Sequence, residues 1–203
     1  IRFKDEGQSK HNETWCYENG ISDYLLSELG GVDLAPEFPF CGQVKKSDWQ
    51  LDWAIAWLVN GGEPVCESYV NLIPTIQGGT HVSGFRTGLV EALREFCEFR
   101  DLLPRGIRLT PEDVWNPASY LLSVHMKDPQ FSGQTKERLS SRECAAFVSG
   151  TIKDAFSLWL NQHTADAERV AAIAIHNAEA RVRSDRQVER KKVATGPALP
   201  GKL

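Results

Sequence analysis

The sequence predicts an α+β fold, a mostly antiparallel sheet with helices packed on it, followed by a long C-terminal helix. Large apolar residues alternate with small or polar ones over residues 49–58, which is the period of a strand. Apolar residues recur at helical spacing over residues 80–100 and again after residue 141. Residues 165–192 are rich in Ala, Glu and Arg, which favours a long helix. A length of 203 residues suits one domain with an appendage, or two small domains.

The first part of the chain is expected to form short strands and one helix. Residues 21–29 have helical spacing, and Gly30 and Gly31 end that helix. Residues 33–46 contain two prolines and a glycine and are expected to form a loop. The three tryptophans of 49–58 are expected in the core rather than on a ligand platform. The other expected elements are a strand end at 1–4, a polar turn at 5–12, a strand at 13–18, a hairpin connection at 60–64 and a return strand at 65–73.

The second part of the chain is expected to be mainly helical. Thr80 is expected to cap a helix that runs to about residue 100. Thr110 caps a short helix that has Pro111 at its first position. The other expected elements are a strand at 119–127, a capping box at 140–143 that starts a helix, a break near 162–164, a helix at 165–192 and a stop at 196–201.

Composition excludes several classes of function. The net charge of −4 argues against a surface that binds nucleic acid as a whole. No apolar run is long enough to cross a membrane. The five cysteines are odd in number and form no C-x-x-C pair, which argues against a zinc site and a disulfide framework, and so predicts a cytoplasmic protein. The chain starts at Ile1 inside strand-like sequence and has no signal peptide, so we expect a piece of a longer protein.

The loop at residues 131–136 is the strongest candidate for chemistry. Gln134 and Lys136 are two residues apart, so in an extended loop their side chains leave the same side of the backbone. An amide and an ammonium together can grip a terminal phosphate through charge-assisted hydrogen bonds. The competing interpretation is an ordinary solvated surface loop. Phosphate-loop, dinucleotide, metalloprotease and nucleophile-elbow motifs are missing, and His81 and His125 are expected to be structural, so no complete active site is predicted.

Several motifs, taken together and in order along the whole chain, resemble the B subunits of bacterial type IIA DNA topoisomerases. Within that family the stretches at 71–74 and 103–104 are more similar to topoisomerase IV than to gyrase. The motifs that carry the resemblance are Gly78-Gly79-Thr80-His81, Gly84-Phe85-Arg86, Asp128-Pro129-Gln130-Phe131, Gln134-Thr135-Lys136 and Leu199-Pro200-Gly201-Lys202-Leu203.

The resemblance implies that the chain is a transducer domain, which couples ATP binding and hydrolysis to closure of a DNA clamp and to strand passage. It implies a transducer domain at 1–162 with a left-handed β-α-β crossover, a helical extension at 163–194 and a linker at 195–203 toward a Toprim domain. It also implies an ATP-binding domain of the GHKL type before this chain, which would hold most of the ATP and the Mg²⁺. The implied partners are the A subunit, DNA and a second copy of the B subunit.

The same resemblance assigns roles to three residues. Lys136 matches a lysine that contacts the γ-phosphate of ATP, and Gln134 matches its neighbouring glutamine. Arg86 matches an arginine that lines the DNA cavity of the closed clamp; the alternative is a surface arginine with no partner. No metal ligand is assigned, and the chain alone is expected to be inactive as an ATPase.

Three alternatives remain open at this point. The chain fits a gyrase B subunit, or a dimerisation module of another GHKL ATPase, less well than it fits topoisomerase IV. A plain nucleic-acid-binding module could use the basic residues of 181–192. Acidic residues are interleaved with them, which favours a solvated helix face instead.

Overall fold

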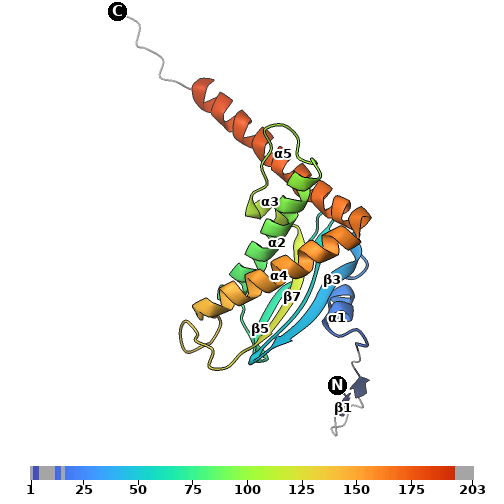
Figure 1. Ribbon diagram of the computed structural model, residues 1–203, viewed down its shortest axis with the longest axis vertical. Coiled ribbons are helices and arrows are strands. Elements are labelled where there is room, and N and C mark those ends of the chain that lie inside the picture. The colour runs from blue at the N-terminus through green and yellow to red at the C-terminus, as the bar shows by residue number, and fades with distance from the viewer. Residues whose placement is uncertain (1, 5–11, 15–16, 195–203) are drawn as a thin grey trace, which may run out of the picture. The chain divides into compact units, whose positions relative to one another are not determined.

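The computed structural model describes residues 2–4, 12–14 and 17–194, with side chains described from residue 17 to residue 185 (Figure 1). The chain divides into two compact units. The first, called the sheet unit, contains Ile1–Val82 and Ala118–Arg142. The second, called the helical unit, contains Ser83–Pro117 and Glu143–Leu203. The turn at 5–12 is therefore described only at its last residue, and Trp15 of the second expected strand and the 196–201 stop lie outside the described residues.

The sheet unit contains a five-stranded sheet in the order β3-β4-β7-β5-β6. Neighbouring strands are antiparallel, except for β5 and β7, which are parallel. Strands β1 (Arg2–Lys4) and β2 (Asn12–Thr14) form a separate antiparallel pair. The α+β prediction is confirmed, with a sheet that is mostly antiparallel. The five strands are β3 (Leu34–Lys46), β4 (Trp49–Leu58), β5 (Cys66–Val70), β6 (Ile73–Pro74) and β7 (Ala118–His125).

Strand β4 carries the core of this unit because it is buried on both faces. Trp53 and Trp57 are 3% and 1% exposed, which confirms the core prediction for these two tryptophans; Trp49 is only half-buried. The opposite face carries alanines and belongs to a cluster with helix α1 (Ile21–Leu29), which ends at Gly30 as predicted. Small side chains on that face leave room for the helix. The buried members of the cluster are Leu25, Leu29, Leu34, Ala54, Ala56, Leu58 and Leu121.

The loop predicted at 33–46 is wrong, because these residues form the 13-residue strand β3. The prolines that suggested a loop lie where the register with β4 shifts, between Ala35 and Phe40. The Ala35–Pro36 peptide bond is cis. Since β3 is an edge strand with a bulge, the missing proline N–H groups break no central ladder.

The predicted hairpin at 60–64 is also wrong. Strand β5 pairs with β7 and not with β4, because β7 lies between them in the sheet. The predicted return strand is split into β5 and β6 by a turn at Asn71 and Leu72, which both have positive φ. The connection from β5 to β7 contains two helices, as a parallel pair requires. The left-handed sense of this crossover stays a prediction from the family resemblance.

The helical unit is built on two long helices with closely packed backbones. Helix α2 (Thr80–Phe99) and helix α4 (Arg142–Gln162) meet at Gly84 and Gly88, where a Cβ atom would lie under 3.0 Å from backbone atoms of α4. Helix α5 (Thr164–Ala194) begins after the break predicted near 162–164, which is confirmed. The short helix α3 (Pro111–Trp115) lies beside α5 (Figure 1).

Helix capping was predicted correctly at Thr110 and wrongly at Thr80, and the capping box at 140–143 stays a prediction. Thr110 caps α3 with a capping box in which Asp113 is the reciprocal residue. Thr80 is the first residue of α2, and its buried hydroxyl has no hydrogen-bond partner in the described part of the chain, so its predicted role as a side-chain cap is wrong. The hydroxyl of Ser141, in the predicted capping box, accepts a hydrogen bond from the backbone N–H of Gln130 at 2.9 Å.

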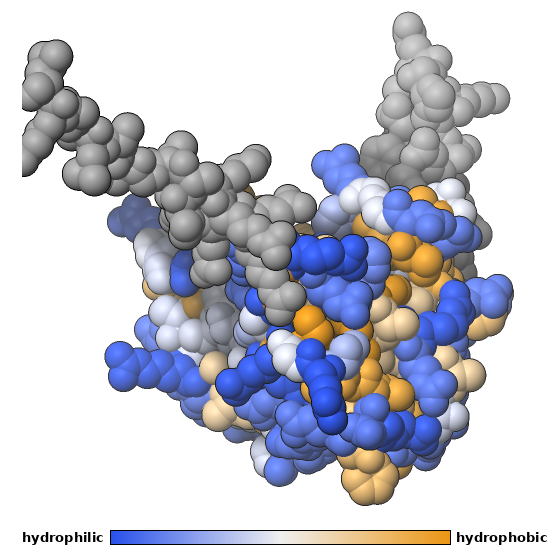
Figure 2. Space-filling model, turned by 90° about the horizontal axis from the view of Figure 1, so that it is seen from above, coloured by the Kyte–Doolittle hydropathy of each residue, from blue (hydrophilic) through white to orange (hydrophobic). Residues whose placement is uncertain are grey.

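The face of the molecule drawn in Figure 2 is mostly hydrophilic, with a smaller hydrophobic area among the polar residues. Among the described residues, no helix is both long enough and apolar enough to span a membrane.

Candidate functional site

The loop that contains Lys136 has two ends that are hydrogen-bonded to each other. We call residues 130–140 the Lys136 loop. Phe131 and Leu139 form an antiparallel bridge at its base. The N–H of Ser132 donates to the carbonyl of Arg138, and the N–H of Ser140 donates to the carbonyl of Gln130, both at 2.8 Å. These contacts fix the two ends of the loop and leave residues 133–136 at its tip.

A second segment, residues 77–80, braces the base of this loop. We call it the bracing segment. The N–H groups of Gln77 and Thr80 donate to the carbonyls of Glu137 and Leu139, and the N–H of Leu139 donates to the carbonyl of Gly78, at 3.0–3.1 Å. The Gln77 amide also donates to the Glu137 carboxylate at 2.7 Å. Two segments about sixty residues apart are thereby joined in one small structure.

Gly79 is required for this contact. It forms a parallel bridge with Leu139, has φ +137°, and a Cβ atom there would lie under 3.0 Å from the Leu139 backbone. Any other residue would be strained and would push the two segments apart. The bracing segment was missed in the sequence as part of the site, although its Gly78-Gly79 pair was a visible signal.

The two predicted phosphate contacts, Gln134 and Lys136, are both exposed at the tip. The tip is not extended: Gln134 lies in a turn, Gly133 has φ +84° and Lys136 has φ +57°. Gln134 and Lys136 therefore do not leave the same side of an extended backbone, contrary to the prediction from their spacing. Within the described residues, neither side chain has a hydrogen-bond or ion-pair partner, so the Lys136 ammonium is accessible to an external anion.

A buried polar network lies at the start of α2, next to the bracing segment. His81 is fully buried, and its Nε2 lies 3.0 Å from the hydroxyl of Thr75. The Thr75 hydroxyl is also 2.7 Å from the hydroxyl of Ser68 in β5. Burial lowers the pKa of His81 from 6.5 to about 4, so the ring is neutral near pH 7. This supports the structural role predicted for His81.

Arg86 lies on α2 and is paired. Its guanidinium donates to the carboxylate of Glu112 in α3 at 2.5 Å, and its side chain is 33% exposed. The alternative of a surface arginine with no partner is therefore wrong. Hydrogen bonds from the Glu112 backbone and from Arg86 lower the pKa of Glu112. A phosphate that approaches Arg86 would compete with this carboxylate.

No metal centre is apparent among the described residues, where no group of three or more His, Cys, Asp and Glu side chains could hold an ion. The four described cysteines are free thiols, Cys41, Cys66, Cys97 and Cys144. Side chains beyond residue 185, which hold much of the basic 181–192 stretch, lie outside the described part.

Comparison with known proteins identifies close relatives over the whole chain. A family model described as DNA gyrase B matches residues 20–190. The B subunits of DNA topoisomerase 4 from Salmonella typhimurium and Escherichia coli are each 57% identical over all of this chain, and the corresponding protein of Francisella tularensis is 35% identical. The chain spans 32% of the length of each of these three relatives.

Solved structures are similar as well. The topoisomerase IV ATP-binding domain of Francisella tularensis, in complex with a small-molecule inhibitor, has a TM-score of 0.77 and 34% identity over 90% of this chain and 48% of that one. The 43K ATPase domain of Thermus thermophilus gyrase B, in complex with an aminocoumarin, has a TM-score of 0.82 over 93% of this chain and 50% of that one. Its identity is 24%, so it supports the fold alone.

Proposed function

The chain belongs to the DNA gyrase B family, and on that premise we propose that it couples ATP binding and hydrolysis to clamp closure and DNA strand passage in a type IIA topoisomerase. In this proposal residues 1–162 are the transducer domain, 163–194 its helical extension and 195–203 a linker toward a Toprim domain. The complete enzyme would relax and decatenate DNA in the cytoplasm.

The observation that carries the proposal is the braced, outward-facing Lys136. A lysine at the tip of a loop with a fixed base can reach the γ-phosphate of an ATP held by another domain. Such a cation stabilises the charge that develops on the phosphoryl group during transfer. ATP offers this contact and ADP does not, and this difference in contacts allows a ligand to shift a conformational equilibrium.

Among the described residues, those proposed for the nucleotide fit its phosphate end. Lys136 would bind the γ-phosphate, and Gln134 would donate from its amide beside it. No carboxylate cluster for Mg²⁺ is found among the described residues, so other domains of the full-length protein would hold the metal and the adenine. Supplied there, Mg²⁺ would neutralise charge on the phosphates.

The proposed partners are an A subunit, a DNA duplex and a second copy of the B subunit in the closed clamp. Arg86 is the proposed DNA contact in the clamp cavity, where it would meet phosphates without reading sequence. Because Arg86 is paired with Glu112, a DNA phosphate would have to replace the Glu112 carboxylate as its partner. The names of the 57% identical relatives favour the topoisomerase IV branch over the gyrase alternative.

The test is ATP turnover by the full-length protein with its A subunit and DNA, wild type against Lys136→Ala. We expect turnover to fall on the order of 10²-fold, with nucleotide affinity mostly retained, because the contact is made mainly in the transition state. Lys45→Ala, which removes an exposed lysine from β3, is the matched control and should have no effect. Unchanged turnover in Lys136→Ala would refute the role of this loop.

A further inference from the structure

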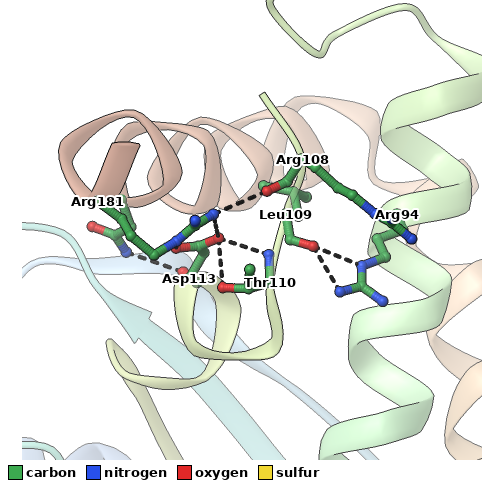
Figure 3. Close-up of polar contacts among 7 residues, drawn as sticks. Arg94, Arg108, Leu109, Thr110, Asp113 and Arg181 are labelled. Atoms are coloured by element: carbon green, nitrogen blue, oxygen red, sulfur yellow. Dashed lines mark hydrogen bonds and ion pairs between the residues drawn. The ribbon is translucent and has the colours of Figure 1, made fainter. Parts of the chain in front are cut away.

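The short helix α3 is held between two long helices by arginines. From α2, Arg94 donates through Nε and Nη2 to the carbonyl of Leu109, at 3.0 and 2.6 Å (Figure 3). Arg86, also on α2, pairs with Glu112. From α5, Arg181 pairs with Asp113. The segment around α3 is therefore a polar connection from α2 to α5, in addition to the exposed ion pair between Arg100, just after α2, and Glu168 of α5.

The Asp113 carboxylate is the centre of this connection. Its side chain is only 3% exposed. Arg181 binds it through two nitrogens, Nε at 3.0 Å and Nη2 at 2.8 Å, and Thr110 donates its backbone N–H and its hydroxyl at 2.7 and 2.8 Å (Figure 3). Burial alone would raise the pKa of Asp113, but these hydrogen bonds outweigh it and hold the pKa below its ordinary value.

Two further hydrogen bonds attach α5 at the same place. Arg181 Nη2 also donates to the carbonyl of Arg108 at 3.0 Å, and the Asn177 amide donates to the carbonyl of Asp113 at 3.1 Å. A paired, nearly buried carboxylate with this many donors has one well-defined geometry. The contact therefore fits only one position of α5 against the α3 segment.

Packing of the rest of the buried face of α5 fixes the position of this helix much less strongly. Its buried residues are four alanines and one valine, and Ala178 is the last of them in the described part. Alanine buries little apolar area, so this face gives limited resistance to a shift of the helix. Residues 183–185 are exposed, and Arg181 makes the last described hydrogen bonds from α5 to the α3 segment. The buried residues are Ala167, Val170, Ala171, Ala174 and Ala178.

Helix α2 also connects the α3 segment to the Lys136 loop. Helix α2 starts at Thr80, whose N–H donates to Leu139 in the base of that loop. Backbone hydrogen bonds, a continuous helix and the arginine contacts with the α3 segment therefore connect the loop to α5. The Asp113–Arg181 contact is the last step of this route.

We propose that Asp113 and Arg181 form a latch that transmits the state of the Lys136 loop to α5. They are positioning residues: they touch no nucleotide, and they set whether α5 follows the nucleotide-bound state. This inference rests on the proposed function. It adds that a substitution at Asp113 or Arg181, distant in sequence from Lys136, can reduce strand passage without reducing ATP turnover.

The experiment uses the full-length protein with its A subunit and DNA, and measures strand passages per ATP hydrolysed. For Arg181→Ala we expect ATP turnover without DNA to stay within about twofold, because the latch does not touch the nucleotide. Passages per ATP should fall about tenfold, which is a typical size for the coupling between two sites. Arg183→Ala is the matched control, since Arg183 lies on the same helix, is exposed and pairs only with Glu179 among the described contacts.

Arg181→Lys separates coupling from simple stability. Lysine keeps the positive charge but cannot form the two-nitrogen contact with Asp113. We expect this variant to fold with wild-type ATP turnover and still lose passages per ATP. If turnover and passage fall in parallel in both variants, or if passages per ATP stay normal, the latch is refuted. The proposed function is tested separately, because Lys136→Ala must reduce turnover whatever the latch does.

Discussion

At the scale of a single residue, the burial of His81 makes the stability of the chain depend on pH. The folded chain holds this ring neutral with a pKa of about 4, against 6.5 for the ordinary side chain. Between these two values the unfolded chain binds a proton that the folded chain does not, so stability rises with pH across this window. Stability from this group is fully present above the unfolded pKa and is lost as pH falls toward the folded pKa.

We predict that the free energy of unfolding falls by about 2 kcal/mol from roughly pH 7.5 to pH 5 through His81. Urea denaturation of the chain at the two pH values measures it. His81→Gln, which keeps a polar partner for Thr75, should remove most of this dependence. His125→Gln, at a half-buried histidine of β7, should leave it in place. An unchanged pH dependence in His81→Gln would contradict the assignment.

The candidate site was only partly predictable at this scale. Lys136 and Gln134 were identified from their side-chain chemistry and from the family resemblance. The bracing of their loop could not be predicted from the sequence, because it consists mainly of backbone hydrogen bonds between segments about sixty residues apart. Any residue carries a backbone N–H and carbonyl, so such a contact leaves almost no trace in the sequence. The trace it left was Gly79.

At the scale of elements, the packing of α2 on α4 depends on two glycines. A Cβ at Gly84 would lie under 3.0 Å from the Ala145 carbonyl oxygen, and one at Gly88 would lie 2.5 Å from the Ser149 carbonyl oxygen. These atoms belong to the helix backbone and cannot move away as a flexible side chain can. The four-residue spacing puts both glycines on one face of α2.

We predict that Gly84→Ala and Gly88→Ala each destabilise the chain by about 1–3 kcal/mol through overpacking. The matched control is Gly150→Ala in α4, where a Cβ would meet nothing within 4 Å. That change should stabilise the chain by about 0.5–1 kcal/mol, because alanine favours helix over glycine. Denaturant unfolding measures all three variants. Equal stability of Gly84→Ala and Gly150→Ala would refute close packing at this contact.

Sequence patterns placed the helices well and the sheet less well. Helix α1 and the break before α5 follow from local spacing and from glycine. Strand β3 was missed because prolines are compatible with a strand mainly at the edge of a sheet or at a bulge, and edge position is not a local property. The partner of β5 was missed because β7, which separates it from β4, comes about fifty residues later in the chain. Strand order is set by packing between distant segments.

At the scale of the whole molecule, we propose that the chain supplies a cation for the γ-phosphate and a helix, α5, that responds to it, while other domains supply the rest of the ATPase site. Its one proposed phosphate ligand pair is exposed, and a lone lysine holds a nucleotide weakly because water screens the charge. The groups that would bind adenine and Mg²⁺ and activate water would come from the remaining two-thirds of the relatives' length. The proposed activity therefore depends on closing other domains over Lys136.

We predict that the 203-residue chain alone shows no ATP turnover above background, and that millimolar ATP raises its unfolding free energy by less than about 1 kcal/mol. The full-length protein should show both turnover and a clear stabilisation under the same conditions. A coupled phosphate-release assay and thermal unfolding measure the two effects. Turnover by the isolated chain that disappears in Lys136→Ala would mean that the catalytic groups lie within this chain, and the division of labour proposed between its loop and the other domains would be wrong.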